Sequence, residues 1–142
     1  MEIEEIAREL VDSGYKVRTE LGPGLLESVY EVVVAKLLTD RGLRVERQKS
    51  VPIIFQGLRF DEGFRADLLV EGKLLVEIKS VENLAPVHGK QLLTYLRLLN
   101  LPLGLLMNFG AAIFKNGIKR IVNNRSDFAA SRAPGLIEDV DK

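Results

Sequence analysis

The chain has 142 residues, the size of one domain, and its formal net charge is zero, which argues against a general nucleic-acid coat protein. It contains no cysteine, so disulfides and thiolate chemistry are excluded. No stretch approaches the ~18 uninterrupted apolar residues of a membrane span, and nearly half of the residues are hydrophobic, which is enough for a core.

The N-terminal part of the chain predicts two helices. Residues 2–19 carry apolar positions at approximate helical spacing and acids in the first turn, which predicts a helix that covers the core. The acidic start is also the opposite of a signal peptide, so a cytoplasmic protein is expected. After a breaker cluster at residues 21–24, a second helix is predicted from about Leu25 to Asp40, ending before Gly42.

Short strands with short links follow, and this pattern indicates an antiparallel meander. Residues 44–50 alternate charged and other side chains and predict a half-exposed edge strand, and residues 52–56 predict a second strand. Turns are expected at Gly57 and Gly63, with a short strand between them. Phe64 then leads into a further strand.

Residues 65–80, RADLLVEGKLLVEIKS, carry charge where buried strands should be apolar. They predict two strands joined by a tight turn at Gly72, with Asp67 in the first strand and Glu77 and Lys79 in the second. Because Glu77 and Lys79 are two positions apart, they project from the same face of their strand. Buried charges must be paired or hold a metal, so these three residues are candidates for a functional site.

The length of the turn decides whether Asp67 shares the face of Glu77. A two-residue loop would turn Asp67 away, whereas a three-residue loop with Gly72 in the left-handed conformation places the carboxylates side by side or diagonal. We predict the three-residue loop. Two carboxylates and an ammonium group then form a divalent-cation site with a cationic neighbour. From this segment alone, a structural ion pair between Lys79 and one acid remains an alternative.

The next stretch predicts a helix and a buried strand. Asn83 suits the N-cap and Pro86 the first turn of a helix that runs to about residue 99. Leu103–Asn108 is continuously apolar up to its last residue and predicts a buried strand.

The C-terminal part predicts a hairpin over residues 112–122, because Asn116-Gly117 is a strong two-residue turn signal. Beyond it the periodic pattern ends. One domain is therefore expected over residues 1–125, followed by a loose tail at 126–142.

His88, Gln91 and Tyr95 form one polar stripe on the otherwise Leu-rich helix. A solvated helix face explains Gln91 and Tyr95 as well as a functional role does. His88 has neither a cysteine nor a second histidine to join it, so a zinc site is not expected.

Charge is unevenly distributed along the chain. Acids outnumber bases in residues 1–40, whereas residues 83–125 carry bases and no acid. A neutral protein with basic segments can bind a polyanion on one face, although solvated surface charge explains the pattern equally well.

Four short motifs occur in a specific order: Gly24-Leu-Leu-Glu27-Ser-Val-Tyr30, Asp67, Glu77-Ile78-Lys79 and Gln91-Leu-Leu-Thr-Tyr95. Together they resemble the PD-(D/E)XK nuclease superfamily, and the first is similar to the segment that names its GxxExxY family. The helical Glu and the last motif also resemble the RecB-type exonuclease branch. The resemblance covers roughly residues 10–122. One departure is Ala66, which stands where the superfamily motif has Pro.

The resemblance implies an α/β, restriction-endonuclease-like fold. Its mixed central β-sheet is flanked by helices, and its core order is αβββαβ, the order predicted above from the residues. The implied activity is metal-dependent hydrolysis of DNA, or less commonly of RNA. Nucleic acid is the implied partner, no membrane is involved, and a homodimer or a larger complex is compatible with the pattern.

The resemblance also assigns metal ligands and a catalytic lysine. Asp67 and Glu77 would ligate one or two Mg²⁺ or Mn²⁺ ions, with the carbonyl of Ile78 and waters completing the shell. Lys79 would orient the attacking water and offset charge on the phosphate. Glu27 would hold a metal-bound water or a second ion.

Four further residues receive supporting roles from the resemblance. Gln91 and Tyr95 would position the phosphate or the active-site lysine. Arg65 and Arg47 are weaker candidates for contacts with the nucleic-acid backbone.

Two alternatives to an autonomous nuclease remain. The fold could serve as a nucleic-acid-binding or protein-interaction module without useful turnover, or as a subunit that cuts only within a complex. A buried Asp and Glu without a metal would be costly, which argues against the first alternative.

Overall fold

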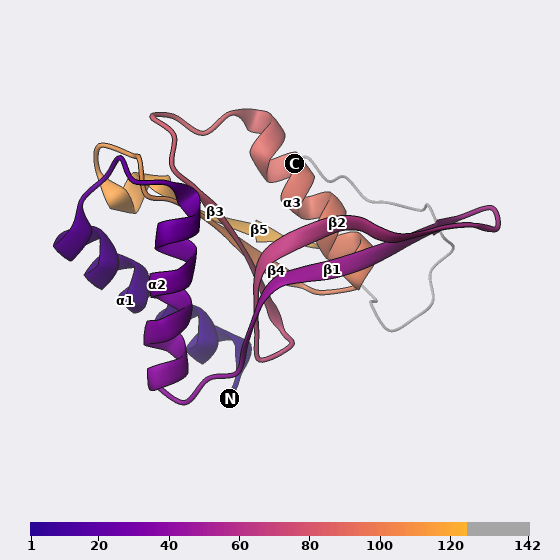
Figure 1. Cartoon of the computed structure of the whole chain (residues 1–142), viewed down its shortest axis with the longest axis horizontal. Helices are drawn as coiled ribbons and strands as arrows, with labels where there is room; N and C mark the ends of the chain where they lie inside the picture. Colours follow the sequence, from indigo (N-terminus) through magenta and orange to yellow (C-terminus); the bar gives the residue numbers. More distant parts are fainter. Residues whose placement is uncertain (125–142) are drawn as a thin grey trace.

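The computed structural model describes residues 1–124, which form a five-stranded sheet with helices on both faces (Figure 1). The predicted tail at 126–142 lies outside the described residues. No helix among residues 1–124 combines the length and apolarity needed to cross a bilayer. The elements in chain order are α1 (Ile3–Leu21), α2 (Glu27–Asp40), β1 (Val45–Phe55), β2 (Leu58–Val70), β3 (Leu74–Lys79), α3 (Pro86–Leu99), β4 (Leu103–Asn108), the 3₁₀ helix η1 (Phe114–Gly117) and β5 (Ile118–Val122).

The strands lie in the sheet in their sequence order. β1, β2 and β3 form an antiparallel meander, β3 runs parallel to β4, and β5 is antiparallel to β4. Parallel neighbours need a crossover connection, which α3 supplies. The predicted α/β fold with the core order of a helix, three strands, a helix and a strand is confirmed, with α1 before this core and β5 after it.

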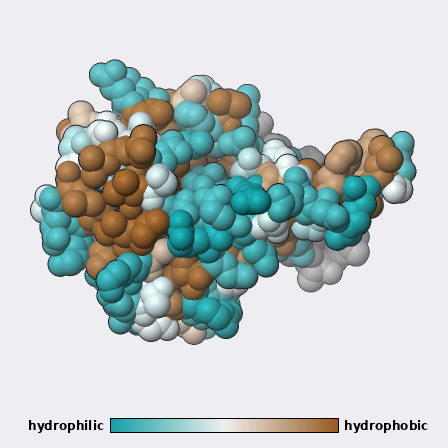
Figure 2. All heavy atoms as spheres, viewed as in Figure 1, coloured by the Kyte–Doolittle hydropathy of each residue, from teal (hydrophilic) through white to brown (hydrophobic). Residues whose placement is uncertain are grey.

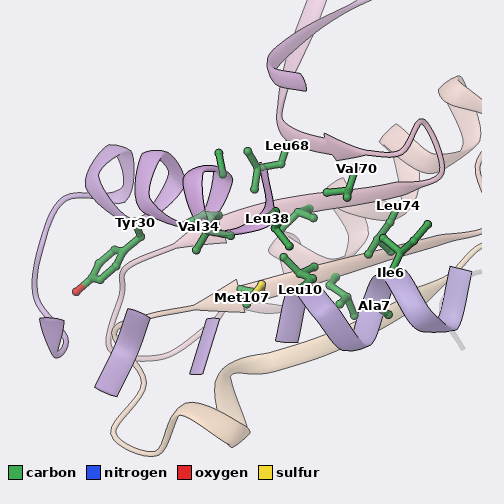
Figure 3. Close-up of a cluster of buried hydrophobic side chains, with 14 of the residues drawn as sticks. Ile6, Ala7, Leu10, Tyr30, Val34, Leu38, Leu68, Val70, Leu74 and Met107 are labelled. Atoms are coloured by element: carbon green, nitrogen blue, oxygen red, sulfur yellow. The ribbon is translucent and has the colours of Figure 1, made fainter. Parts of the chain in front are cut away.

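Two apolar clusters hold the helices against the sheet. The larger cluster joins α1 and α2 to one face and includes the fully buried Ile6, Tyr30 and Leu74 (Figure 3). The smaller cluster joins α3 to the opposite face and includes Leu92 of α3 and Leu75 of β3. Full burial of one such side chain contributes about 1.5–3 kcal/mol, so these clusters fix the helices that carry the candidate site residues.

β1 and β2 form a long hairpin that extends beyond the body of the molecule (Figure 1). The prediction of separate shorter strands with a turn at Gly63 is wrong, because β1 and β2 are each continuous and Gly63 lies inside β2. The register shifts next to Pro52, which has no N–H to donate to the ladder. Gly63 provides space there, since a Cβ atom would collide with the Ile53 side chain.

Two predictions in the C-terminal half are also wrong. Ala85, not Asn83, precedes the helix, because the residue before Pro86 is held extended and Pro86 takes the first helical position. Asn116-Gly117 lies in η1 and not in a two-residue turn, and β5 pairs with β4. Gly117 serves close packing, because a Cβ atom there would lie 2.6 Å from the carbonyl oxygen of Asn108.

The loop after β4 packs directly on the backbone of the loop after β3. A Cβ atom on Gly110 would lie 2.7 Å from the backbone nitrogen of Val81 and 2.8 Å from its carbonyl carbon. Backbone atoms cannot rotate away as a flexible side chain can. We therefore expect Gly110→Ala to lower the free energy of unfolding, measured by urea denaturation, by about 1–3 kcal/mol, the usual cost of overpacking.

Gly89→Ala is the matched control for this prediction. A Cβ atom on Gly89, within α3, would meet Ile121 Cδ1 at 3.4 Å, an ordinary contact. This variant should be unchanged or gain up to ~1 kcal/mol, because alanine favours helix over glycine. Equal destabilisation of both variants would contradict the packing argument.

Candidate active site

The loop between β2 and β3 has three residues, as predicted from the position of Gly72. Val70 pairs with Leu74, which leaves three residues for the loop, and Gly72 has a φ of +64° in the left-handed region. Continued along the strands, this register sets Asp67 opposite Glu77. The predicted juxtaposition of the two carboxyl groups is therefore confirmed.

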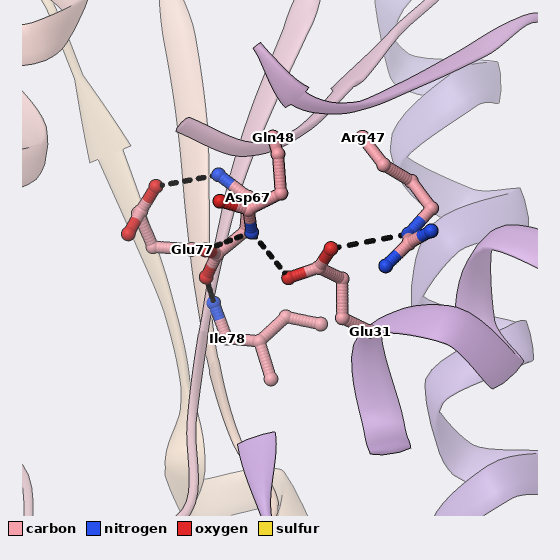
Figure 4. Close-up of polar contacts among 6 residues, drawn as sticks. All are labelled: Glu31, Arg47, Gln48, Asp67, Glu77 and Ile78. Carbon is pink, nitrogen blue, oxygen red and sulfur yellow. Dashed lines mark hydrogen bonds and ion pairs between the residues drawn. The ribbon is translucent and has the colours of Figure 1, made fainter. Parts of the chain in front are cut away.

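The two carboxylates replace backbone groups where the strands separate. The backbone pairing of β2 with β3 reaches Leu68 and Val76. Beyond it, Glu77 Oε2 accepts a hydrogen bond from the Asp67 N–H at 3.1 Å, and Asp67 Oδ2 accepts one from the Ile78 N–H at 2.8 Å (Figure 4). These crossed hydrogen bonds fix the two side chains next to each other.

Burial raises the pKa of both carboxyl groups. Glu77 is 6% exposed, and burial, followed by the nearby charge of Asp67, raises its pKa from 4.5 to about 8. Burial also raises the pKa of Asp67 above its ordinary 3.8; the hydrogen bond from Ile78 opposes this and the charge of Glu31 adds to it. Such a pair gains stability from a bound cation, because a cation favours the charged forms.

Lys79 lies two residues beyond Glu77 on the same side of β3, as the spacing predicts. Its charge is close enough to lower the pKa of Glu77. Even so, Lys79 forms no ion pair with any acid among residues 1–124. The alternative of a direct structural ion pair is therefore not formed in this part of the chain, and the ammonium group is available to a ligand.

Hydrogen bonds of a buried tyrosine hold the loop before α2. Tyr30 is fully buried and stacks on Phe109, with 4.4 Å between ring centroids. Its hydroxyl donates to the carbonyl of Gly22 at 2.6 Å and accepts from the Leu25 N–H at 3.1 Å. The Ser80 hydroxyl, immediately after β3, donates to the carbonyl of Leu25 at 2.7 Å. The start of α2 is thereby attached to the end of β3.

Glu27 is brought near the carboxylate pair by this attachment. It is the first residue of α2 and is exposed, a position that the positive end of the helix dipole favours. Its charge contributes to raising the pKa of both Asp67 and Glu77. The sequence motif thus places an additional acid within electrostatic range of the pair.

α3 brings Tyr95 near the carboxylates but leaves Gln91 in solvent. The ring of Tyr95 stacks on Phe64 with centroids 3.7 Å apart. Burial, then the charges of Glu77 and Asp67, raise the pKa of Tyr95. Gln91 is exposed, and its side chain forms no hydrogen bond within the described part of the chain.

Sequence reasoning missed two polar residues that touch the site. Glu31, buried on α2, accepts from Gln48 Nε2 at 2.7 Å and from Arg47 Nε at 3.1 Å (Figure 4). Gln48 Nε2 also lies 3.3 Å from Asp67 Oδ1. The amide of Gln48 therefore bridges an acid of α2 and a predicted metal ligand.

One of these residues had a usable sequence signal. Glu31 follows Glu27 by four positions and shares its helix face. Gln48 had none, because its φ of +52° inside β1 is a left-handed conformation that sequence pattern does not mark. Such outliers cluster at functional sites.

These residues lie within a domain that matches a known family. Residues 4–121 match the family model described as the PD-(D/E)XK nuclease superfamily. The chain belongs to this superfamily. No curated protein and no solved structure shows significant similarity to it. Membership implies a nucleic-acid substrate and use of a divalent metal.

The donor atoms of this PD-(D/E)XK chain fit a divalent metal. Glu77 Oε1 accepts no hydrogen bond from residues 1–124 and is free to act as a ligand beside Asp67. The same residues contain no cluster of three or more acidic, His or Cys side chains that could hold a metal. Mg²⁺ is commonly bound by one or two carboxylates together with waters and substrate phosphates. Asp67 and Glu77 match that kind of incomplete protein shell.

The two arginines predicted to contact nucleic acid are already paired. Arg47 is paired with Glu31, and the exposed Arg65 is paired with Glu62 at 3.1 Å. Exposed ion pairs contribute only about 0–1 kcal/mol to the stability of a fold. Arg65 can therefore exchange Glu62 for a phosphate group at a low cost in free energy. The role of both arginines in this PD-(D/E)XK chain stays a prediction.

Proposed function

We propose that the protein is a metal-dependent phosphodiesterase that hydrolyses DNA in preference to RNA, within the GxxExxY family. The observation that carries the proposal is the crossed pair of Asp67 and Glu77 with Lys79 beside it, which has no ion-pair partner among residues 1–124. The family assignment rests on the segment from Gly24 to Tyr30, whose tyrosine holds the loop that leads to Glu27.

The proposed metal ligands are Asp67, Glu77 and the carbonyl of Ile78, with Mg²⁺ or Mn²⁺ as the ion. When bound, the ion supplies a more acidic water and neutralises charge on the phosphate oxygens. Glu27 would accept a hydrogen bond from a water at the edge of the site, since it lies within electrostatic range of both carboxylates.

Among the protein side chains, Lys79 would have the main catalytic role. Its ammonium group orients the attacking water and stabilises charge that grows on the phosphate oxygens as the new P–O bond forms and the ester bond breaks. The Tyr95 hydroxyl, whose raised pKa keeps it protonated, would donate a hydrogen bond to the phosphate. Gln91, one helical turn earlier, would contact the phosphate from solvent.

A substrate panel tests this proposal. Wild type and Asp67→Asn would be incubated with circular and linear DNA, single- and double-stranded, and with RNA, each in Mg²⁺, Mn²⁺ or EDTA. We expect cleavage by wild type only with a metal, faster on DNA, and lost in the variant because one ligand is removed. Cleavage of circular DNA would show endonuclease action.

Binding of nucleic acid without cleavage under every condition would contradict autonomous catalysis. A subunit that acts only in a complex would then be favoured, because large apolar side chains are exposed at two places. These are the residues immediately before and at the start of α2, where Leu26 is 74% exposed, and the β1–β2 hairpin, where Phe55 is 61% exposed. Figure 2 shows brown apolar atoms over the helical end of the molecule and near the tip of the hairpin.

Gln48→Gly tests the bridge between Asp67 and Glu31. Glycine tolerates the left-handed backbone, so the variant removes the amide without adding backbone strain. We expect cleavage to fall roughly 10–100-fold, because residues that orient metal ligands have effects of this size. Cleavage rates would be measured against metal concentration. Gln56→Gly, at another left-handed position on the hairpin, is the control, and equal losses in both variants would contradict the role of the bridge.

A further inference from the structure

A polar cavity lies beside the catalytic strands. It has a volume of about 520 Å³ and is lined by residues 82–84, after β3, and by residues of the segment 108–119, which runs from the end of β4 to the start of β5. This volume lies in the range of small-molecule sites, roughly 300–1,000 Å³. β3 and β4 are parallel, with Lys79 paired to Asn108, so the cavity opens at the end of the sheet that carries the catalytic lysine. Ligands of open α/β sheets bind outside the carboxyl ends of parallel strands.

One side-chain amide that lines the cavity is buried and has a fixed orientation. Asn108 is 1% exposed and lines the cavity. Its Oδ1 accepts from the Val81 N–H at 3.0 Å and from the Gly110 N–H at 3.1 Å. Two N–H donors require the oxygen at that position, so Nδ2 is the remaining group. Nδ2 has no hydrogen-bond partner among residues 1–124, and it can donate to a ligand.

Two further amides line the same cavity. The side chains of Asn83 and Asn116 are exposed and form no hydrogen bond with another described residue. Together with Asn108 they define what we call the amide cavity. Ile113, 61% exposed, and the half-buried Leu84 add apolar surface to it.

The lining suits a nucleobase better than a phosphate group. Among the described residues its only charged members are Glu82 and Lys119, which are of opposite sign. Phosphate sites are typically built from arginine, lysine or clustered N–H groups. Amide side chains offer a donor and an acceptor that match the edge of a base. Apolar side chains contact the faces of bases that have left the stack.

We propose that the amide cavity binds one unpaired nucleobase of the substrate, next to the phosphate that is cleaved. This inference rests on the proposed nuclease function and narrows it. The substrate then has a single-stranded or flipped-out nucleotide at the cleavage position, because a base that is stacked inside a duplex cannot enter a cavity.

A titration followed by NMR tests base binding without any cleavage step. The ¹⁵N-labelled full chain would be titrated with deoxynucleoside monophosphates, and with deoxyribose 5-phosphate as the matched ligand without a base. We expect the nucleotides alone to shift the side-chain amide signals of Asn83, Asn108 and Asn116. The double variant Asn83→Ala/Asn116→Ala should bind at least ~10-fold more weakly, whereas Asn124→Ala, an exposed asparagine outside the cavity, should bind as wild type does.

Two results would overturn the inference. Equal shifts with deoxyribose phosphate would make the cavity an anion site, and absence of shifts at these amides would remove it as a ligand site. DNA cleavage by the same preparation separates the two claims. Cleavage without base binding refutes the amide cavity alone, whereas base binding without cleavage refutes the nuclease and leaves a nucleotide-binding protein.

Discussion

Lys79→Ala is expected to reduce metal-dependent DNA cleavage by roughly 10²–10³-fold, the usual cost of removing one group that stabilises transition-state charge. The fold should persist, because Lys79 forms no ion pair among residues 1–124 whose loss would leave a buried acid unpaired. Single-turnover cleavage rates at saturating metal would measure the effect, since they isolate the chemical step from product release.

Lys16→Ala is the matched control for this variant. Lys16 lies on α1 in an exposed ion pair with Glu20, and such pairs contribute little to the stability of the fold. Its cleavage rate should equal that of wild type. A rate for Lys79→Ala within a few-fold of wild type would exclude the lysine from the chemistry.

The second large effect concerns stability and pH in the absence of metal. The pKa of Glu77 in the folded protein is about 8, above its ordinary value of 4.5, so the folded state binds more protons than the unfolded state between these values. The contribution of Glu77 protonation to the free energy of unfolding is therefore fully present below about pH 4.5 and is lost as the pH rises to 8. The shift corresponds to at most about 5 kcal/mol. The raised pKa of Asp67 acts in the same direction.

Urea denaturation in EDTA between pH 5 and pH 9 measures this dependence. The free energy of unfolding should fall with rising pH in wild type and less steeply in Glu77→Gln, which cannot ionise. Near pH 8 the variant should be the more stable protein. Glu20→Gln, on the surface of α1, should follow wild type. A wild-type curve that rises from pH 5 to pH 8 would contradict the buried, destabilising carboxyl pair.

The core of the site could be predicted because local rules determine it. The two-residue period of a strand puts Glu77 and Lys79 on one side, and the parity of the loop at Gly72 decides the position of Asp67. Both rules depend on neighbours in sequence, and the structure follows them. The order of helices and strands was predictable for the same reason.

Features that depend on distant contacts could not be predicted. Gly63 and Gly117 look like turn glycines in the sequence, but each is required because another part of the chain packs on it. The bridge from Gln48 to Glu31 and Asp67 depends on the close approach of α2 to β1 and on a left-handed residue inside a strand. The amide cavity likewise joins segments that are about thirty residues apart.

Cleavage of DNA by Glu77→Gln, compared with wild type at the same Mg²⁺ concentration, tests the central claim most directly. The variant keeps an oxygen that can accept a hydrogen bond from the Asp67 N–H, so it should still fold. A loss of cleavage can then be attributed to the missing carboxylate. We expect a folded protein, more stable than wild type in EDTA at pH 8, that does not cleave. A folded variant that cleaves at the wild-type rate would show that Asp67 and Glu77 are not the metal-dependent catalytic pair.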